Sequence, residues 1–181
     1  MGSGRDRRFE VRWVIGARER LAFMILLYTG LRRGDAAILG RQHVTDGVIF
    51  MRAEKTGTQL TIPILPELAS VIEATKTGDL TFVATTSGAP MRKESFGNWF
   101  REACTAAGVP GSAHGLRKAG AARAASNGAT VAQLEAIFGW HGGTMASLYT
   151  RSADRVRLAK EAIGKLSRNE MATPIPNRPL R

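Results

Sequence analysis

The chain has 181 residues, of which 44% are hydrophobic, and a formal net charge of +11 at neutral pH. This length suits one domain with a tail, and the hydrophobic content suffices for a buried core. No apolar stretch is long enough to cross a bilayer, and no hydrophobic leader opens the sequence. Arginine, whose planar fork matches phosphate oxygens, predominates among the basic residues, so the charge favours nucleic acid over a membrane as the partner. The alternative is a generally basic soluble protein.

The two ends of the chain are expected to lie outside the folded domain. Residues 1–4 resemble an expression tag, so residues 1–10 are predicted to be tag and disordered N-terminus. The domain is expected over residues 11–168, and the proline-containing residues 169–181 are expected to form a flexible tail. The single cysteine, Cys104, cannot form an internal disulfide, which together with the missing leader favours a bacterial cytoplasmic, DNA-associated protein. The three histidines lack metal-ligand spacing, so no metal is expected.

Periodicity and capping residues predict a mostly helical chain. The apolar run at 17–29 indicates a largely buried helix. Pro66 suits a first helical turn, Ser112 an N-cap, and the pair Thr130 and Gln133 forms a capping-box pattern. A further short helix carries Tyr149. The other helices are expected over 35–39, 66–75, 93–107, 114–126, 130–138 and 153–166.

The strands form one small antiparallel sheet. Residues 48–53 and 59–64 read as a β-hairpin whose connection, 54–58, contains Gly57 for a positive φ and Lys55 near the tip. Residues 81–85 are predicted to add a third strand. The expected fold class is therefore mainly α with a small antiparallel β-sheet (α+β).

Four segments stand out when they are read together. They are Thr29-Gly30-Leu31-Arg32, Lys55-Thr56-Gly57, His114-Gly115-Leu116-Arg117, and Gly139-Trp140 with Tyr149 nine positions after Trp140. In these residues and this order, residues 17–165 resemble the catalytic domain of the tyrosine recombinase (phage integrase) family. Each motif alone is weak evidence, but the set in register is highly specific. The resemblance implies the DNA breaking-rejoining catalytic-domain fold.

The resemblance also implies a chemistry. Cutting DNA by transesterification needs an oxygen nucleophile, positive charge on the non-bridging oxygens and a proton for the leaving oxygen. The resemblance assigns Tyr149 as the nucleophile of a covalent 3′-phosphotyrosine intermediate, Arg32 and Arg117 as the oxygen ligands, and Lys55 as the acid for the leaving 5′-oxygen. His114 is implied to contact the phosphate and to help move the nucleophile's proton. No cofactor is required.

The residues leave alternatives open at positions 140 and 141 and at position 35. Trp140 stands where most relatives have histidine and a minority tryptophan; its indole N–H can donate to a phosphate oxygen but cannot shuttle protons. His141 is the alternative occupant, although only Trp140 keeps the spacing to the tyrosine. Asp35 matches an acidic position of the family and either orients active-site side chains or is an ordinary helix-start acid.

Several basic residues are candidates for contacts with the DNA backbone, although an isolated basic residue is usually only a solvated charge. Lys118 follows Arg117 immediately and is expected to point away from the active site. The candidates are Arg92, Lys93, Arg101, Lys118 and Arg123.

By resemblance, the activity is site-specific recombination, the integration or excision of a mobile element, on double-stranded DNA. A homotetramer is expected in the synaptic complex, with residues 153–166 docking onto a neighbouring subunit, accessory DNA-bending proteins as possible partners, and a monomer for the chain alone. The family's N-terminal core-binding domain is absent from this sequence, which predicts weak DNA binding. The alternatives are a non-catalytic DNA-binding module with the same fold, strand relaxation as in type IB topoisomerases, and a basic helical domain with accidental matches.

Overall fold

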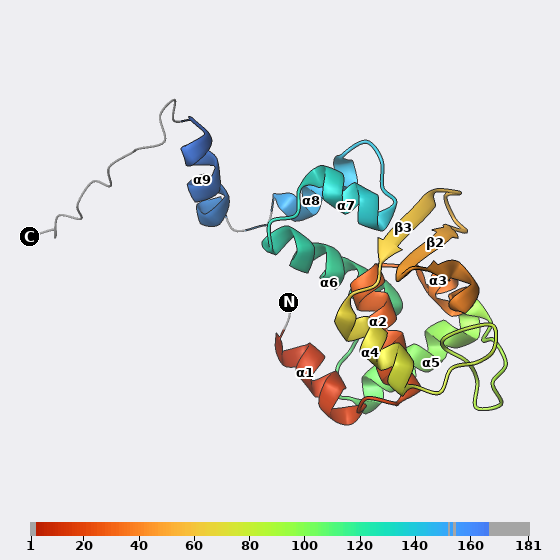
Figure 1. Cartoon of the computed structure of the whole chain (residues 1–181). Helices are drawn as coiled ribbons and strands as arrows, with labels where there is room; N and C mark the ends of the chain where they lie inside the picture. Colours follow the sequence, from red (N-terminus) through yellow and green to blue (C-terminus); the bar gives the residue numbers. More distant parts are fainter. Residues whose placement is uncertain (1–2, 152, 154, 167–181) are drawn as a thin grey trace, which may run out of the picture.

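The computed structural model describes residues 3–151, 153 and 155–166. The expected tail at 169–181 lies outside the described residues. The fold is mainly helical with one small sheet, as predicted (Figure 1). The helices are α1 (Ser3–Arg12), α2 (Arg18–Thr29), α3 (Arg33–Ile38), α4 (Pro66–Ala74), α5 (Lys93–Ala106), α6 (Ala113–Ser126), α7 (Val131–Phe138), α8 (Thr144–Thr150) and α9 (Arg155–Ile163), with short 3-10 turns η1 (Arg41–His43) and η2 (Gly164–Leu166). None of the described helices is long and apolar enough to span a membrane.

The sheet has the order β1-β2-β3, with β1 (Val44–Thr45), β2 (Val48–Arg52) and β3 (Gln59–Pro63) all antiparallel. The predicted hairpin is β2–β3, and the pairing of Ile49 with Ile62 places apolar side chains on one face. This face is buried and the other is exposed, as the alternation of the two strands requires. Gly57 has the expected positive φ, 66°. The hairpin thus brings Lys55 to an exposed turn.

Residues 81–85 do not form the predicted third strand, which is β1 instead. Phe82 and Val83 are buried, and the Phe82 N–H donates to the Leu39 carbonyl at 2.8 Å. The segment makes only an isolated bridge, between Ala84 and Pro90. Proline has no N–H to donate, so the bridge cannot grow into a ladder.

Helix α2 runs through the middle of the main core (Figure 1). All residues from Leu21 to Leu27 are buried, which explains why this helix is apolar on every side. Helix α6 packs closely against it: a Cβ on Gly120 would lie 2.6 Å from the Leu27 carbonyl oxygen. A second, smaller core joins α6, α7 and α8 around Leu134, Phe138 and Ala146. The active-site motifs lie where these two cores meet.

The Thr-Gly pair that ends α2 is a helix C-cap. Gly30 is left-handed, with φ 61°, and the Thr29 hydroxyl donates to the Ile25 carbonyl at 2.6 Å and accepts from the Leu31 N–H at 3.2 Å. A Cβ on Gly30 would lie 2.6 Å from Cδ1 of Phe138 on α7. Glycine is therefore required both by the backbone and by the packing of α7 against this turn.

Gly30→Ala is expected to lower the free energy of unfolding by about 3 kcal/mol, about half from the left-handed backbone and half from overpacking against Phe138. Gly108→Ala is the matched control, because Gly108 has φ 63° and open space around its Cα. Urea unfolding of both variants measures the difference. Equal losses would show that Phe138 does not constrain position 30.

The prediction of a disordered N-terminus is wrong for residues 3–10, which belong to α1. Phe9 is 1% exposed and stacks on Phe23 of α2 with ring centroids 4.7 Å apart. The Arg20 guanidinium also pairs with the Glu10 carboxylate at 3.1 Å. The sequence expectation rested on local composition, whereas a single aromatic anchor docks the helix.

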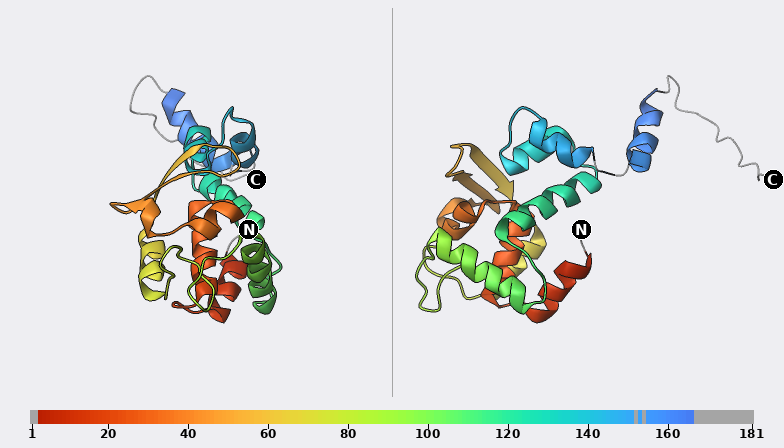
Figure 2. Two further views of the ribbon diagram at one scale, coloured as in Figure 1. Left: turned by 90° about the vertical axis from the view of Figure 1, so that its right-hand side faces the viewer. Right: turned by 180° about the vertical axis from the view of Figure 1, so that it is seen from behind.

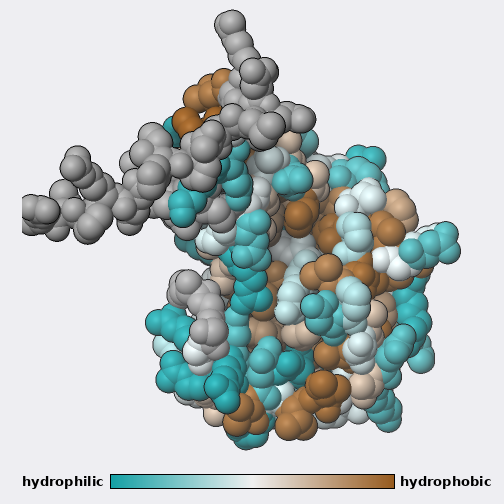
Figure 3. Space-filling model, turned by 60° about the vertical axis from the view of Figure 1, so that its left-hand side comes forward, coloured by the Kyte–Doolittle hydropathy of each residue, from teal (hydrophilic) through white to brown (hydrophobic). Residues whose placement is uncertain are grey.

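The other side of α1 remains at the surface. Val11, Val14 and Ile15, at and after its end, are among the exposed apolar residues. The face of the molecule in Figure 3 is mixed in hydropathy, with hydrophobic residues scattered among hydrophilic ones. Cys104 is buried in the main core, and burial raises the pKa of its thiol to about 11.

Figure 2 shows α9 standing apart from the packed body.

Candidate active site

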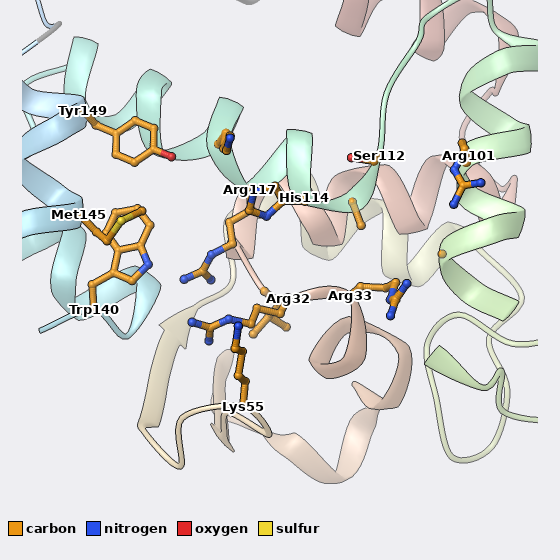
Figure 4. Close-up of a pocket in the computed structure, with 14 residues that line it drawn as sticks. Arg32, Arg33, Lys55, Arg101, Ser112, His114, Arg117, Trp140, Met145 and Tyr149 are labelled. Carbon is orange, nitrogen blue, oxygen red and sulfur yellow. The ribbon is translucent and has the colours of Figure 1, made fainter. Parts of the chain in front are cut away.

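A cavity of about 700 Å³ opens between the start of α3, the β2–β3 turn, α5, the start of α6, and the segment from Trp140 to α8 (Figure 4). It is lined by all six residues to which the family resemblance assigns catalysis: Arg32, Lys55, His114, Arg117, Trp140 and Tyr149. These residues are spread over more than a hundred positions of sequence. No aspartate or glutamate is among the described residues that line it. The cavity is therefore cationic, with one phenol.

The Arg117 side chain links two of the turns that form the cavity wall. It is 6% exposed, and its Nη1 donates to the carbonyl of Gly30 while its Nη2 donates to the carbonyl of Phe138 at 2.6 Å. These carbonyls lie at the ends of α2 and α7, just before Arg32 and Trp140 in the chain. Guanidinium has five N–H donors, so donors remain for phosphate oxygens. Arg117 thus both lines the site and fixes the two turns that present its neighbours.

The surroundings of Arg117 are electrostatically costly. Burial, and after it the nearby charge of Arg32, lower the pKa of its guanidinium to about 10, although Asp35 and Tyr149 act in the opposite direction. Two neighbouring cations with only partial compensation favour the binding of an anion. The arrangement is suited to the non-bridging oxygens of a phosphodiester.

Three aromatic rings form a stack that ends at the tyrosine. Phe138 and Trp140 have centroids 4.8 Å apart, and Trp140 and Tyr149 are 5.4 Å apart with planes only 6° from parallel. Arg117 lies 5.3 Å from the centroid of the Trp140 ring, within cation–π range. Figure 4 shows the Tyr149 hydroxyl directed into the cavity. Stacking therefore sets the plane and direction of the phenol.

The turn between α7 and α8 is also held in place. Glu135 on α7 accepts a hydrogen bond from the Gly143 N–H at 2.6 Å, directly before α8 begins. Ala146, on the inner face of α8, is fully buried in the second core. These contacts position Tyr149 without touching it.

Trp140 and His141, the two alternative occupants of the same site position, lie in different places in the structure. Trp140 lines the cavity, whereas the His141 ring lies outside it, with its Nε2 3.4 Å from the Thr58 hydroxyl on the hairpin. His141 therefore contacts the connection that carries Lys55. The nine-residue spacing to Tyr149 selected the residue that faces the cavity.

Asp35 is 1% exposed and anchors the hairpin turn rather than lying at a helix surface. Its Oδ1 accepts a hydrogen bond from the Glu54 N–H at 2.9 Å, next to Lys55. The Glu54 carboxylate in turn pairs with the Lys93 ammonium at 2.6 Å, which raises the pKa of Lys93. A Cβ on Gly34 would lie 2.6 Å from Glu54 Oε2, so glycine leaves room for this carboxylate. Two contacts thus tie the Lys55 turn to α3 and α5.

Asp35→Ala is expected to lower the free energy of unfolding by about 2 kcal/mol, because the Glu54 N–H loses its buried acceptor. In the DNA cleavage that the family resemblance implies, a looser Lys55 turn is expected to slow the reaction about 10-fold, a fraction of the full contribution of a general acid. Urea unfolding and single-turnover cleavage measure the two effects. Asp35→Asn, which keeps an acceptor oxygen, should retain most of the stability; a loss equal to that of alanine would contradict the hydrogen-bond argument.

The structure divides the other basic candidates. Arg101 and Lys118 line the cavity. The expectation that Lys118 points away from the cavity is wrong. The cavity wall includes Ala113 and His114 as well as Arg117 on α6, and Lys118 is part of the same wall. Lys93 is engaged by Glu54, and Arg92 does not line the cavity.

Arg123, predicted as a candidate for contact with the DNA backbone, is engaged by an acidic side chain instead. Its guanidinium pairs with the Asp6 carboxylate of α1, the helix that was expected to be disordered. Arg33, conversely, was missed by the sequence analysis and lines the cavity. Its only signal in the sequence is its position beside Arg32. None of the described His, Cys, Asp and Glu side chains cluster in a group that could hold a metal ion.

The sequence profile of the Phage integrase family matches residues 13–155. The chain belongs to the phage integrase family. Solved tyrosine recombinases share its fold, and phage integrase structures include a lambda integrase (residues 75–356) bound to DNA, with 22% identity and a TM-score of 0.69 over 86% of this chain and 60% of that one. No curated protein matches the chain in sequence.

Two further solved structures share the fold of this chain. XerA recombinase has 17% identity and a TM-score of 0.72, covering 93% of this chain and 65% of that one. The Tn1549 transposon integrase in complex with a circular intermediate DNA has 21% identity and a TM-score of 0.65, covering 81% and 58%. The chain therefore spans less than two thirds of the length of each of these proteins. At these identities the likeness establishes the fold.

Proposed function

We propose that the chain is the catalytic domain of a site-specific recombinase that cuts and rejoins double-stranded DNA of a mobile element through Tyr149. The observation that carries the proposal is the convergence of a directed phenol with Arg32, Arg117 and Lys55 in one cavity. The cationic lining supplies the charge that phosphoryl transfer requires. In the proposed reaction the positive charge comes from these side chains, which include no carboxylate among the described lining residues.

In the proposed reaction, the Tyr149 oxygen attacks the scissile phosphorus and forms a 3′-phosphotyrosine bond while the bond to the 5′-oxygen breaks. Arg32 and Arg117 hold the two non-bridging oxygens, and the Trp140 indole N–H donates to one of them. The phenolic proton passes to His114, and the leaving 5′-oxygen takes a proton from Lys55. Attack by the 5′-hydroxyl of another strand reverses the step, so rejoining needs no ATP.

The proposed assembly is a tetramer on two duplexes. Lambda integrase has been solved as a dimer bound to a core site and as a tetramer bound to a Holliday junction, each sharing this fold. Helix α9, which stands apart from the packed body, is proposed to dock on a neighbouring subunit. The domain by itself is proposed to be a monomer.

The test is a covalent trapping experiment with the 181-residue chain. Nicked duplexes that carry the junction sequences flanking its gene are incubated with the protein in EDTA, and an SDS-resistant protein–DNA adduct is expected. Trypsin should then yield the nucleotide-bearing peptide 124–151, whose only tyrosine is Tyr149. An adduct on the peptide 21–32, which holds Tyr28, would refute the assignment.

Duplex binding without any adduct would favour the non-catalytic DNA-binding module. If the adduct forms, a supercoiled plasmid separates the remaining alternatives. Processive relaxation without exchange between duplexes indicates a topoisomerase-like enzyme, whereas exchange between junction duplexes indicates a recombinase.

Lys55→Ala is expected to slow adduct formation about 10²- to 10⁴-fold, because an alkoxide would have to leave without a proton. A substrate with sulfur in place of the leaving 5′-oxygen should restore the rate to near that of the unchanged protein, since a thiol with a pKa of about 8.5 leaves unprotonated. Single-turnover rates on both substrates test this role. Equal defects on both would show that Lys55 binds rather than donates the proton.

A further inference from the structure

The cavity extends beyond the residues to which the reaction is assigned. At the end away from Tyr149 it is lined by Arg33 at the start of α3, Gly97 and Arg101 on α5, and Ser112 before α6. Figure 4 shows Tyr149 at one end, Arg117, Arg32 and Lys55 between, and Arg33 and Arg101 toward the other end. Basic side chains therefore continue past the place of the scissile phosphate.

The consecutive residues Arg32 and Arg33 serve different parts of this cavity. Arg32 is the extended N-cap of α3 and Arg33 its first helical residue, so their side chains diverge (Figure 4). Arg33 runs across α5 at Gly97: a Cβ there would lie 2.5 Å from the Arg33 Cδ and 3.1 Å from its Nη1. Glycine in a helix interior destabilises the helix unless something uses the space. At Gly97 the space receives the arginine.

The charge at this end is not neutralised. Neither Arg33 nor Arg101 forms an ion pair with an acid within the described part of the chain, and Arg101 donates only to the Asn98 side-chain oxygen, at 3.2 Å. Lys93 and Arg123, by contrast, are each engaged by a carboxylate. Two arginines with free donors in one cavity match the oxygens of a phosphate.

We infer that Arg33 and Arg101 form a second phosphate subsite, which holds the first phosphate on the leaving-strand side of the cut. The inference rests on the proposed function and deepens it. In an in-line displacement the leaving oxygen lies opposite the attacking one. The strand that ends in the new 5′-hydroxyl therefore runs away from Tyr149, toward Arg33 and Arg101.

This placement gives the subsite a task after cleavage. Once the bond to the 5′-oxygen has broken, the leaving strand is joined to the protein only by noncovalent contacts. A phosphate held by Arg33 and Arg101 keeps the 5′-hydroxyl close to the phosphotyrosine, so that the strand can be rejoined. Without the subsite the strand is released faster and the adduct accumulates.

The test replaces single phosphates of the cleaved strand with neutral methylphosphonates and measures duplex affinity by fluorescence anisotropy in the Tyr149→Phe background. Neutralising the first linkage on the leaving side should weaken binding about 10-fold, as should Arg33→Ala on the natural duplex, with a shallower salt dependence. The two changes together should weaken binding no more than either alone. Arg7→Ala, the charge-matched control at an exposed position of α1, should remain sensitive to the methylphosphonate.

Gly97→Ala gives a second route to the same question. Its Cβ displaces Arg33 while leaving the charge in the chain, so it should reproduce the loss at this linkage without lowering the melting temperature. Additive losses for Arg33→Ala and the methylphosphonate, or coupling to the linkage on the Tyr149 side, would overturn the subsite. A protein that shows the coupling but forms no adduct when Tyr149 is present would keep the subsite and lose the proposed catalysis.

Discussion

Tyr149→Phe is expected to abolish the SDS-resistant adduct entirely, because Tyr149 is the only tyrosine among the described residues that line the cavity. The fold should be nearly unchanged: the ring remains, and with it the stack on Trp140 at 5.4 Å. Loss of one hydroxyl on a half-buried ring should change the free energy of unfolding by less than about 1 kcal/mol. Adduct yield, urea unfolding and duplex affinity are measured together.

Tyr28→Phe is the matched control, since Tyr28 lies partly buried against the main core and not in the cavity. It should form the adduct at the rate of the unchanged protein. Adduct that persists in Tyr149→Phe would overturn the nucleophile assignment. Loss of duplex affinity in the same variant would instead show that the phenol contributes to binding.

Arg117→Ala is expected to have two large effects, one on cleavage and one on stability. Cleavage should fall roughly 10³-fold, as when a preorganised donor to the transition state is removed. The free energy of unfolding should fall by about 3 kcal/mol, because the Gly30 and Phe138 carbonyls lose their buried donor. The cost of burying the guanidinium, which lowers its pKa to about 10, limits this loss.

Arg117→Lys separates the two roles. It keeps a positive charge in the cavity, but an ammonium cannot span both carbonyls and a phosphate as a planar fork does. Its cleavage rate should exceed that of Arg117→Ala while its stability remains low. Arg123→Ala, on the same helix and paired with Asp6, controls for the loss of a partly buried arginine and should still form the adduct. An Arg117→Ala protein as stable as the unchanged one would refute the clamp.

Most local elements followed from sequence patterns, and the candidate catalytic residues followed from the resemblance to the tyrosine recombinase family. The apolar run at 17–29 produced a helix buried on every side, and the alternation around Gly57 produced the hairpin. Ser112 and Thr130 cap their helices as predicted. Such signals act within a few residues, so they do not depend on what packs nearby. Motif spacing likewise favoured Trp140 over His141, and Trp140 is the one of the two that lines the cavity.

Only the tertiary structure decided which neighbouring charges share the cavity. Arg33, which the sequence motifs did not indicate, lines the cavity because its side chain fits over Gly97 of α5. Lys118 lines it as well, because the cavity extends along the first turns of α6. The Asp6 carboxylate of α1, a helix that Phe9 and the Arg20–Glu10 ion pair also dock, engages Arg123. The double role of Arg117 requires two helix ends distant in sequence to meet. Burial and pairing depend on elements that come together only in the folded chain, so a pattern that identifies a basic residue cannot tell what it will face.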